Sequence, residues 1–210
     1  MATADDVIRV ASGEVGYCPL QDPEAGSKYA RWYEAEVEPG ETWLLGPSWE
    51  IAWCCMFVSW VLAKCGVVTR GFPSYNTDLV LGDLPKTVPY EQTMPGDLII
   101  WDWNGDGATD HIGIVEHIGD YELTTIEGNH ANRVERVDRS ESRRFIRAVI
   151  RPDYDRASAY SGTWDAPTVR KMQLWLKRLG YYHGLIDGVF DEGYSMTVAA
   201  FQKFLSDVGV

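Results

Sequence analysis

Residues 49–67, WEIAWCCMFVSWVLAKCGV, decide how the rest of the chain must fold. From Cys54 onward, apolar residues fall on every side of the expected helix, and such a helix belongs in a protein core. Gly66 is of the residue type favoured just past a helix end, so we expect the helix to begin near Cys54 and to stop at Gly66. Cys54 would lie in the first turn, where free backbone N–H groups and the helix dipole favour the thiolate over the thiol.

Two polar segments downstream could supply partners for this cysteine. DHIGIV carries His111, and TIEGN carries Glu127 and Asn129, each in a segment that reads as a strand. A lone cysteine at a helix start is more often a buried core residue. A cysteine on a helix, a histidine on a strand and a carboxylate or amide on the next strand are the parts of a thiol-hydrolase triad. Either Glu127 or Asn129 could orient the imidazole.

The same segments resemble the motifs of the CHAP family of peptidoglycan hydrolases. WCCMFVSW resembles the nucleophile motif, usually Trp-Cys-Ala-x-Phe-Val, while PGDLIIWDW…DHIGIVE and TIEGN resemble the second and third motifs in the expected order. The resemblance implies that Cys54 attacks an amide carbonyl, that His111 protonates the leaving amine and that Glu127 or Asn129 orients His111. The register of Trp53 in this motif makes Cys54 the nucleophile and leaves its neighbour Cys55 in the core.

The order of elements predicts an α+β fold. Helices are expected near residues 3–16 and 28–37, before the helix of Cys54, and the strands come later in the chain. Short links between successive strands imply an antiparallel meander. By resemblance this is the papain-like CHAP fold, with N-terminal helices packed on the sheet. The predicted strands are residues 97–103, 111–118, 121–127, 133–138 and 144–151.

Two further groups of residues are candidates for binding. Trp53 directly precedes Cys54, and the resemblance to cysteine peptidases of this type implies that an upstream tyrosine such as Tyr17 can reach the active site. Both could contact substrate, although aromatic side chains are more often core residues. In DWNGDGATDH, Asp102, Asn104, Asp106 and Asp110 follow the spacing of a calcium loop. The final bidentate acid of such a loop is missing, and Asn-Gly and Asp-Gly are also hairpin formers. Calcium is therefore possible, while the thiol chemistry itself requires no cofactor.

The C-terminal residues change pattern and predict a second, all-α module. After a polar linker at residues 152–164, residues 168–179 read as an amphipathic helix with Val169, Met172, Leu176 and Leu179 on one face. VRKMQLWLKRLGYYHGLIDGVF…TVAAFQKFL resembles a common peptidoglycan-binding helical module. We therefore divide the chain into a CHAP domain at residues 1–151 and a binding module at residues 165–210, which could be truncated.

Composition limits the partners and the compartment. A net charge of −12 argues against binding to nucleic acid or to an anionic membrane surface. The four cysteines form no C-x-x-C pair, so a zinc site is not expected. No apolar run is long enough to span a membrane. The N-terminus lacks the features of a signal peptide, so we expect synthesis in the cytoplasm and release to the cell wall by a holin or another route.

Peptidoglycan hydrolysis, in the manner of a bacteriolytic endolysin, is thus the function that the sequence favours. Two alternatives are a catalytically inactive wall-binding protein and a thiol amidase acting on a non-wall peptide. The sequence does not distinguish cleavage of the muramoyl–L-alanine amide from cleavage within the peptides.

Overall fold

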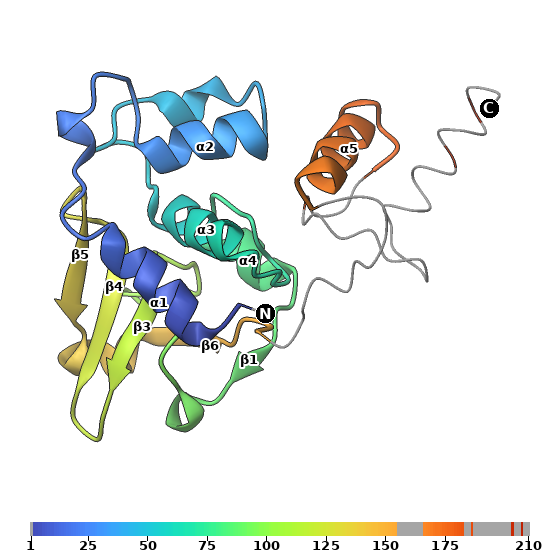
Figure 1. Cartoon of the computed structure of the whole chain (residues 1–210). Helices are drawn as coiled ribbons and strands as arrows, with labels where there is room; N and C mark the ends of the chain where they lie inside the picture. Colours follow the sequence, from blue (N-terminus) through green and yellow to red (C-terminus); the bar gives the residue numbers. More distant parts are fainter. Residues whose placement is uncertain (1, 155–165, 183–185, 187–202, 204–206, 208–210) are drawn as a thin grey trace.

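The computed structural model describes residues 2–154, 166–182, 186, 203 and 207 (Figure 1). In this part of the chain, helices precede a single antiparallel sheet, as the sequence predicts. The α-helices are α1 (Ala4–Gly13), α2 (Lys28–Glu36), α3 (Cys54–Cys65), α4 (Thr77–Gly82) and α5 (Ala166–Arg178). The strands are β1 (Thr87–Val88), β2 (Leu98–Trp101), β3 (His111–Ile118), β4 (Leu123–His130), β5 (Arg133–Asp138) and β6 (Ile146–Ile150).

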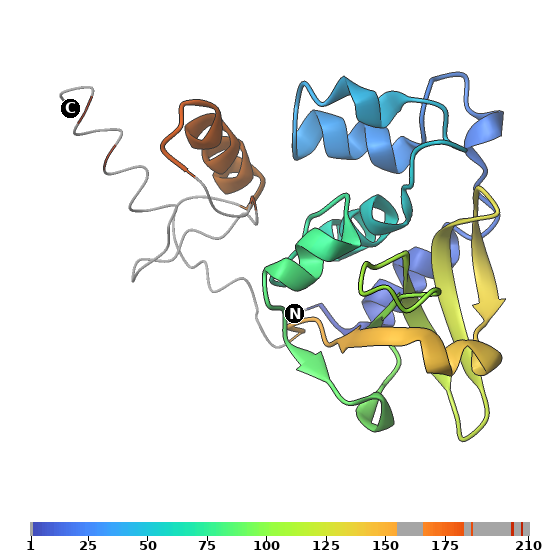
Figure 2. The ribbon, with the colours of Figure 1, turned by 180° about the vertical axis from the view of Figure 1, so that it is seen from behind.

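Helix α3 is the central helix of the layer that covers one face of the sheet. It lies between α2 and the sheet in both views, and it contacts α1, β3 and β4 (Figures 1 and 2). Its predicted limits are confirmed: it begins at Cys54, and Gly66 closes it in the left-handed conformation at φ 68°. Glycine suits this position because it has no Cβ to clash there. All but a few of the side chains of α3 are buried, as expected for a helix that is apolar on every side.

The sheet departs from the predicted meander at its last strand. Its order is β1-β6-β2-β3-β4-β5, so β6 pairs with β2 rather than with β5. A 3-10 segment, Ser140–Phe145, occupies the start of the predicted strand at residues 144–151 and carries the chain back across the sheet. The short strand β1, which was not predicted, pairs with β6 at the edge.

Both faces of the sheet are covered. Ile112, Ile114 and Ile126 point into the main core beneath the helices, together with residues of α1, α2 and α3. The alternate residues Trp101 and Val115 belong to a second cluster on the opposite face, with Phe145 packed against it. The pleat separates these two sets because successive side chains of a strand point to opposite faces.

The C-terminal helix α5 confirms the predicted amphipathic segment at residues 168–179. Val169 and Leu176 are fully buried, and Leu176 packs with Tyr182 and Met172. Leu179, which was predicted on the same apolar face, is 47% exposed. Gly180 adopts a positive φ of 77° just after the helix. Most of the predicted linker and the second predicted C-terminal helix lie outside the described residues.

Across the described residues, no helix combines the length and the apolar character that a membrane crossing requires. All four cysteines are free thiols.

Candidate active site

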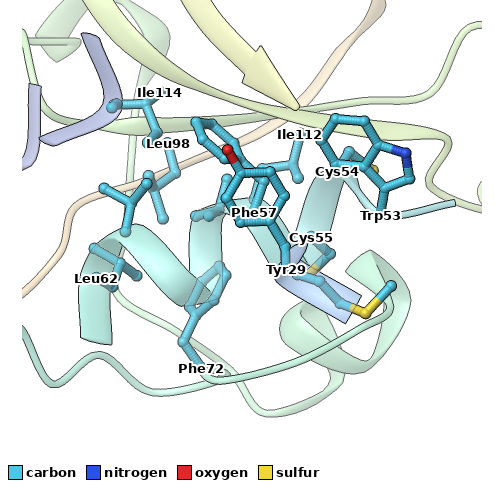
Figure 3. Close-up of a cluster of buried hydrophobic side chains, with 14 of the residues drawn as sticks. Tyr29, Trp53, Cys54, Cys55, Phe57, Leu62, Phe72, Leu98, Ile112 and Ile114 are labelled. Carbon is cyan, nitrogen blue, oxygen red and sulfur yellow. The ribbon is translucent and has the colours of Figure 1, made fainter. Parts of the chain in front are cut away.

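Cys54 is the first residue of α3 and lies in the main core cluster with 5% of its surface exposed (Figure 3). Trp53, the residue before the helix, does not cap it through its side chain, because an indole N–H can only donate. That N–H donates to Asn132 Oδ1 at 3.2 Å. The N–H groups of the first helical turn have no acceptor within the helix. Because Cys54 lies in this first turn, these N–H groups are near its side chain, and the helix dipole favours negative charge on its sulfur.

The helix approaches the sheet closely at one glycine. A Cβ on Gly128 of β4 would lie 2.4 Å from the Cβ of Phe57 and 2.7 Å from its Cγ. Only a residue without a side chain allows this approach. Phe57 lies one helical turn after Cys54, so the contact at Gly128 fixes how near Cys54 comes to the sheet.

His111 is the first residue of β3, and its side chain lies close enough to Cys54 for the two groups to interact electrostatically. Its Nε2 contacts Glu127 Oε2 at 2.7 Å, which leaves Nδ1 for the sulfur. In the strand register His111 lies opposite Trp101 of β2, and their rings are 5.9 Å apart and tilted by 31°. The structure therefore brings Cys54, His111 and Glu127 together in the order that a thiol mechanism needs.

Glu127 of β4 is fully buried, and each of its two carboxylate oxygens makes two hydrogen bonds. Besides His111, it accepts hydrogen bonds from the Thr125 hydroxyl at 2.5 Å, from Arg139 Nε at 2.7 Å and from Arg139 Nη2 at 2.5 Å. A Cβ on Gly113 would lie 2.8 Å from the Cγ of Glu127, so this glycine makes room for the carboxylate arm between β3 and β4.

The electrostatics of the site favour the charged forms of His111 and Glu127. Burial lowers the pKa of His111, but its contacts with Cys54 and Glu127 outweigh burial and raise the pKa to about 9. Burial likewise raises the pKa of Glu127, but hydrogen bonds from Arg139 and His111 outweigh it and bring the pKa down to about 2. At neutral pH the site therefore holds an imidazolium between a sulfur and a carboxylate.

Cys55, the rival nucleophile, lies in a different environment. It is buried, and burial raises its pKa well above the ordinary value, although contacts with Ser74 and Ser59 oppose the shift. A thiol with a raised pKa is a poor nucleophile at neutral pH. The environment of Cys55 is therefore that of a core thiol.

Asn129 does not take the orienting position on β4. The pairing of β4 with β5 shifts register between Glu127 and His130, and Asn129 adopts a positive φ of 61°. In a regular strand residues 127 and 129 would face the same way. The irregularity at Asn129 breaks that alternation. The residue of β4 whose side chain is hydrogen bonded to His111 is Glu127.

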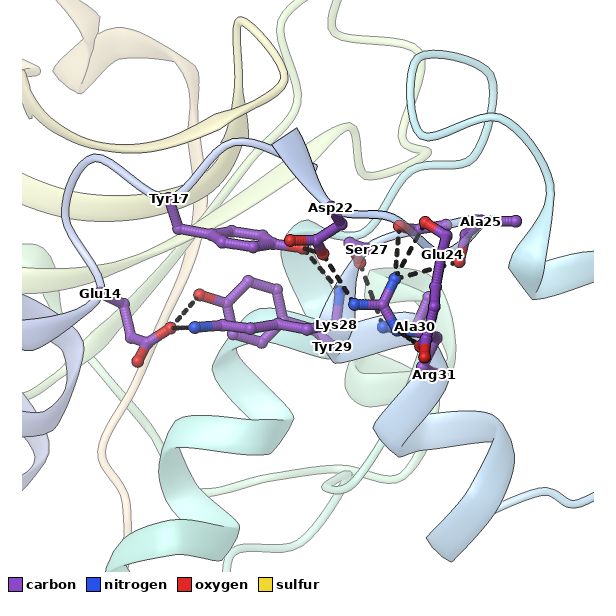
Figure 4. Close-up of polar contacts among 11 residues, drawn as sticks. Glu14, Tyr17, Asp22, Glu24, Ala25, Ser27, Lys28, Tyr29, Ala30 and Arg31 are labelled. Atoms are coloured by element: carbon purple, nitrogen blue, oxygen red, sulfur yellow. Dashed lines mark hydrogen bonds and ion pairs between the residues drawn. The ribbon is translucent and has the colours of Figure 1, made fainter. Parts of the chain in front are cut away.

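Tyr17 is near the site but its hydroxyl is engaged in a polar network (Figure 4). The hydroxyl donates to Asp22 Oδ2 and accepts from the backbone N–H of Lys28, both at 2.7 Å. Its ring meets the ring of Trp53 edge-on at 6.1 Å. Tyr17 thus ties the loop before α2 to the residue that precedes Cys54, and this packing role accounts for its contacts.

The side chain of Trp53, a predicted substrate contact, lies in the core. Trp53 is fully buried, and its ring stacks on Tyr29 at 5.4 Å. An indole at the N-terminal boundary of a core helix buries a large apolar area, and that outcome is the commoner one for an aromatic residue. The exposed tryptophans between α2 and α3 are Trp43, at 51%, and Trp49, at 66%.

The candidate calcium ligands hold their own loop together. Asp102 accepts from the backbone N–H groups of Gly105 and Gly107, at 2.7 and 2.9 Å. Asp110 accepts from the backbone of Trp103, while Asn104 and Asp106 bond each other. Within the described residues, no three histidine, cysteine or acidic side chains are grouped so that they could hold a metal ion. The arrangement is that of a hairpin loop built from Asx turns.

Sequence reasoning missed Arg139 and Asn132. Arg139 follows β5 in a segment rich in arginine, and nothing in its local pattern distinguishes it from Arg143 or Arg144. Asn132 lies in the turn between β4 and β5 at φ 58°, and it bonds both Trp53 and Ser48. Each acts across more than ten positions in sequence, so only the folded chain identifies it.

A cysteine at a helix start, beside a histidine that a buried carboxylate orients, is the arrangement of a thiol hydrolase. The comparisons agree with this class. Residues 46–129 match the model of the CHAP domain, and residues 165–206 match that of the peptidoglycan binding domain. The chain is therefore a CHAP-domain protein with a C-terminal peptidoglycan-binding domain.

Several solved structures match part of this chain at low sequence identity. An NlpC/P60 family protein from Bacillus cereus ATCC 10987 is 16% identical, with a TM-score of 0.44 over 71% of this chain and 40% of its own. NlpC2 from Trichomonas vaginalis is 16% identical, with a TM-score of 0.35 over 64% of this chain and 49% of its own. Ly7917, solved with the hydrolysing product of MDP, is 18% identical, with a TM-score of 0.34 over 71% of this chain and 62% of its own. This chain thus spans less than two thirds of each. No curated protein matches it.

Proposed function

We propose that the protein hydrolyses an amide or peptide bond of bacterial peptidoglycan through a thioester on Cys54. The observation that carries the proposal is the chain of contacts from Cys54 to His111 and from His111 to Glu127 at 2.7 Å. The family matches support peptidoglycan as the substrate, because a CHAP domain and a peptidoglycan-binding domain occur in one chain.

The first half of the reaction forms an acyl-enzyme. The Cys54 thiolate attacks the carbonyl carbon, and the oxyanion is met by backbone N–H groups at the start of α3. The carbon–nitrogen bond then breaks, and the proton on His111 passes to the departing amine. Glu127 keeps the imidazole in place and stabilises its charged form before that transfer.

The second half restores the enzyme. Neutral His111 takes a proton from water, the hydroxide attacks the thioester carbonyl, and the carbon–sulfur bond breaks to release the carboxylic acid. Cys54 leaves as a thiolate beside the reprotonated His111. Besides the substrate, these steps use side chains and backbone N–H groups of this chain and one water molecule.

The test is mass spectrometry of purified peptidoglycan after digestion. Wild type should release soluble fragments, Cys54→Ala should release none, and both should bind the wall to the same extent. Cys65→Ala, at the other end of α3, is the matched control and should behave as wild type. Release by Cys54→Ala at the wild-type rate would exclude the thiol mechanism, and no release by wild type from several wall types would favour the binding-protein alternative.

The same digest assigns the bond. Free L-alanine amino termini with intact stem peptides would identify an amidase, and new termini within stem or crossbridge would identify an endopeptidase. We further propose an endolysin role, with holin-dependent access to the wall. Expression inside bacteria should lyse them only when the membrane is also permeabilised, and lysis without permeabilisation would contradict that role.

A further inference from the structure

The contacts of Arg139 connect it to Glu127 directly and to His111 by way of Trp101. Its Nε and Nη2 donate to the two oxygens of Glu127, at 2.7 and 2.5 Å. One of these oxygens, Oε2, is the atom that also contacts His111. The guanidinium carbon lies 5.2 Å from the ring centre of Trp101, whose ring is also near His111. Arg139 thus lies directly behind the carboxylate that orients the histidine.

The surroundings hold this guanidinium in one place. Trp101 and Trp103 stack with their rings 5.5 Å apart and 12° from parallel, and Arg139 lies over both, 5.0 Å from the centre of Trp103. Its backbone N–H donates to the carbonyl of Leu123 at 2.7 Å, which fastens it to the start of β4. A planar guanidinium on aromatic faces with a two-pronged carboxylate contact is a geometry that lysine cannot reproduce.

We propose that Arg139 is a positioning residue of the catalytic centre, which holds Glu127 charged and aimed at His111. The proposal rests on the proposed function, because it assigns Arg139 a part in that same site. Glu127 offers about four lone-pair positions. Thr125, His111 and the two Arg139 donors fill them, so the carboxylate has one orientation as long as Arg139 is present.

A count of charges predicts what loss of Arg139 does. The titratable and charged groups facing one another are Cys54 from α3, His111 from β3, Glu127 from β4 and Arg139 after β5. In the reactive state two are negative and two positive, so the buried group is neutral. Without Arg139 the remaining three carry a net negative charge in a buried place, and uptake of a proton relieves it. The reactive thiolate should therefore be lost at a higher pH than in the wild type.

The experiment follows Cys54 itself and needs no substrate. The rate of Cys54 alkylation by iodoacetamide is measured against pH by peptide mass spectrometry, which separates it from the other three cysteines. In Arg139→Met, the acid-side midpoint should move up by about one pH unit or more. Arg139→Lys, which keeps the charge and loses the two-pronged contact, should shift by less but in the same direction.

Arg151→Met is the matched control. Arg151 also binds a buried carboxylate through two hydrogen bonds, away from the triad. Its Nε donates to Asp97 Oδ1 at 2.9 Å and its Nη2 donates to Asp97 Oδ2 at 2.8 Å. Its loss should lower the unfolding temperature and leave the alkylation midpoint in place. In a Glu127→Gln background, Arg139→Met should shift the midpoint by less than it does in the wild-type background, because the carboxylate that Arg139 holds is already absent.

Two outcomes would overturn the proposal. One is an unchanged midpoint in both Arg139 variants, with Arg139→Lys serving if Arg139→Met does not fold. The other is an equal shift in Arg151→Met, which would mark the effect as general loss of structure. Since alkylation requires no peptidoglycan, failure of the wild type to digest the wall would refute the proposed function without deciding this test.

Discussion

Gly128→Ala should inactivate the protein by displacing the helix of Cys54. The added Cβ would lie 2.4 Å from Phe57 Cβ, whereas ordinary contact begins at 3.4 Å, so the two backbones must separate by about 1 Å. Because the nearest atom is the Cβ of Phe57, a smaller side chain at position 57 would not relieve the clash. Overpacking of this kind costs about 1–3 kcal/mol of folding free energy.

The displacement should slow catalysis as well as lower stability. A misplacement of about 1 Å between reacting groups can cost about 100-fold in rate. We therefore expect Gly128→Ala to fold, to unfold at a somewhat lower temperature, and to release peptidoglycan fragments about 100-fold more slowly. The assay pairs the digest with thermal unfolding followed by circular dichroism.

Gly82→Ala is the control, because a Cβ there meets no atom within 4 Å. It should leave both the digestion rate and the unfolding temperature near the wild-type values. A Gly128→Ala variant that digests peptidoglycan within threefold of the control would refute the claim that this contact sets the position of Cys54.

Three further predictions concern the site and its supports. Stability should be greatest between about pH 4.5 and 6.5. The pKa of Glu127 is lowered to about 2 in the folded protein, so its contribution to stability is lost as the pH falls below about 4.5. The pKa of His111 is raised to about 9, so its contribution is lost as the pH rises above about 6.5. Unfolding temperatures across pH should flatten in Glu127→Gln, and an unchanged pH curve would contradict the assignment. Tyr17→Phe should cost about 1–3 kcal/mol by removing the acceptor of the Lys28 N–H, with fragment release per folded molecule retained; a selective loss of release would restore Tyr17 as a substrate contact. Chelation of calcium should leave digestion unchanged, because Asp102 is already bonded within its loop, and calcium-dependent activity would refute this.

Local patterns predicted the elements that carry the site. The apolar run after Cys54 and the glycine at 66 specify a core helix and its end, and the structure has α3 at those limits. Alternation and turn residues likewise located β3 and β4, with His111 and Glu127 on them. These features depend on neighbours a few positions away, which is why sequence alone reveals them.

The strand order shows where local reasoning stops. A short link between two strands predicts that they pair, and for β2 through β5 that holds. The last strand instead returns to β2, because the segment Ser140–Phe145 folds as a 3-10 turn over the second cluster. Pairing across such a distance depends on which sheet edge is free once the rest has folded.

The sequence by itself determined the α+β class, the helix that begins at Cys54, and the identities of the cysteine, the histidine and two candidate orienters. Only the tertiary structure decided between Glu127 and Asn129, through the register shift and the positive φ at Asn129. It also placed Arg139 behind Glu127 and buried Trp53. These outcomes belong to the tertiary structure because a strand irregularity, a contact across three strands and the exposure of a side chain are properties of the packed chain, which no short window of sequence contains.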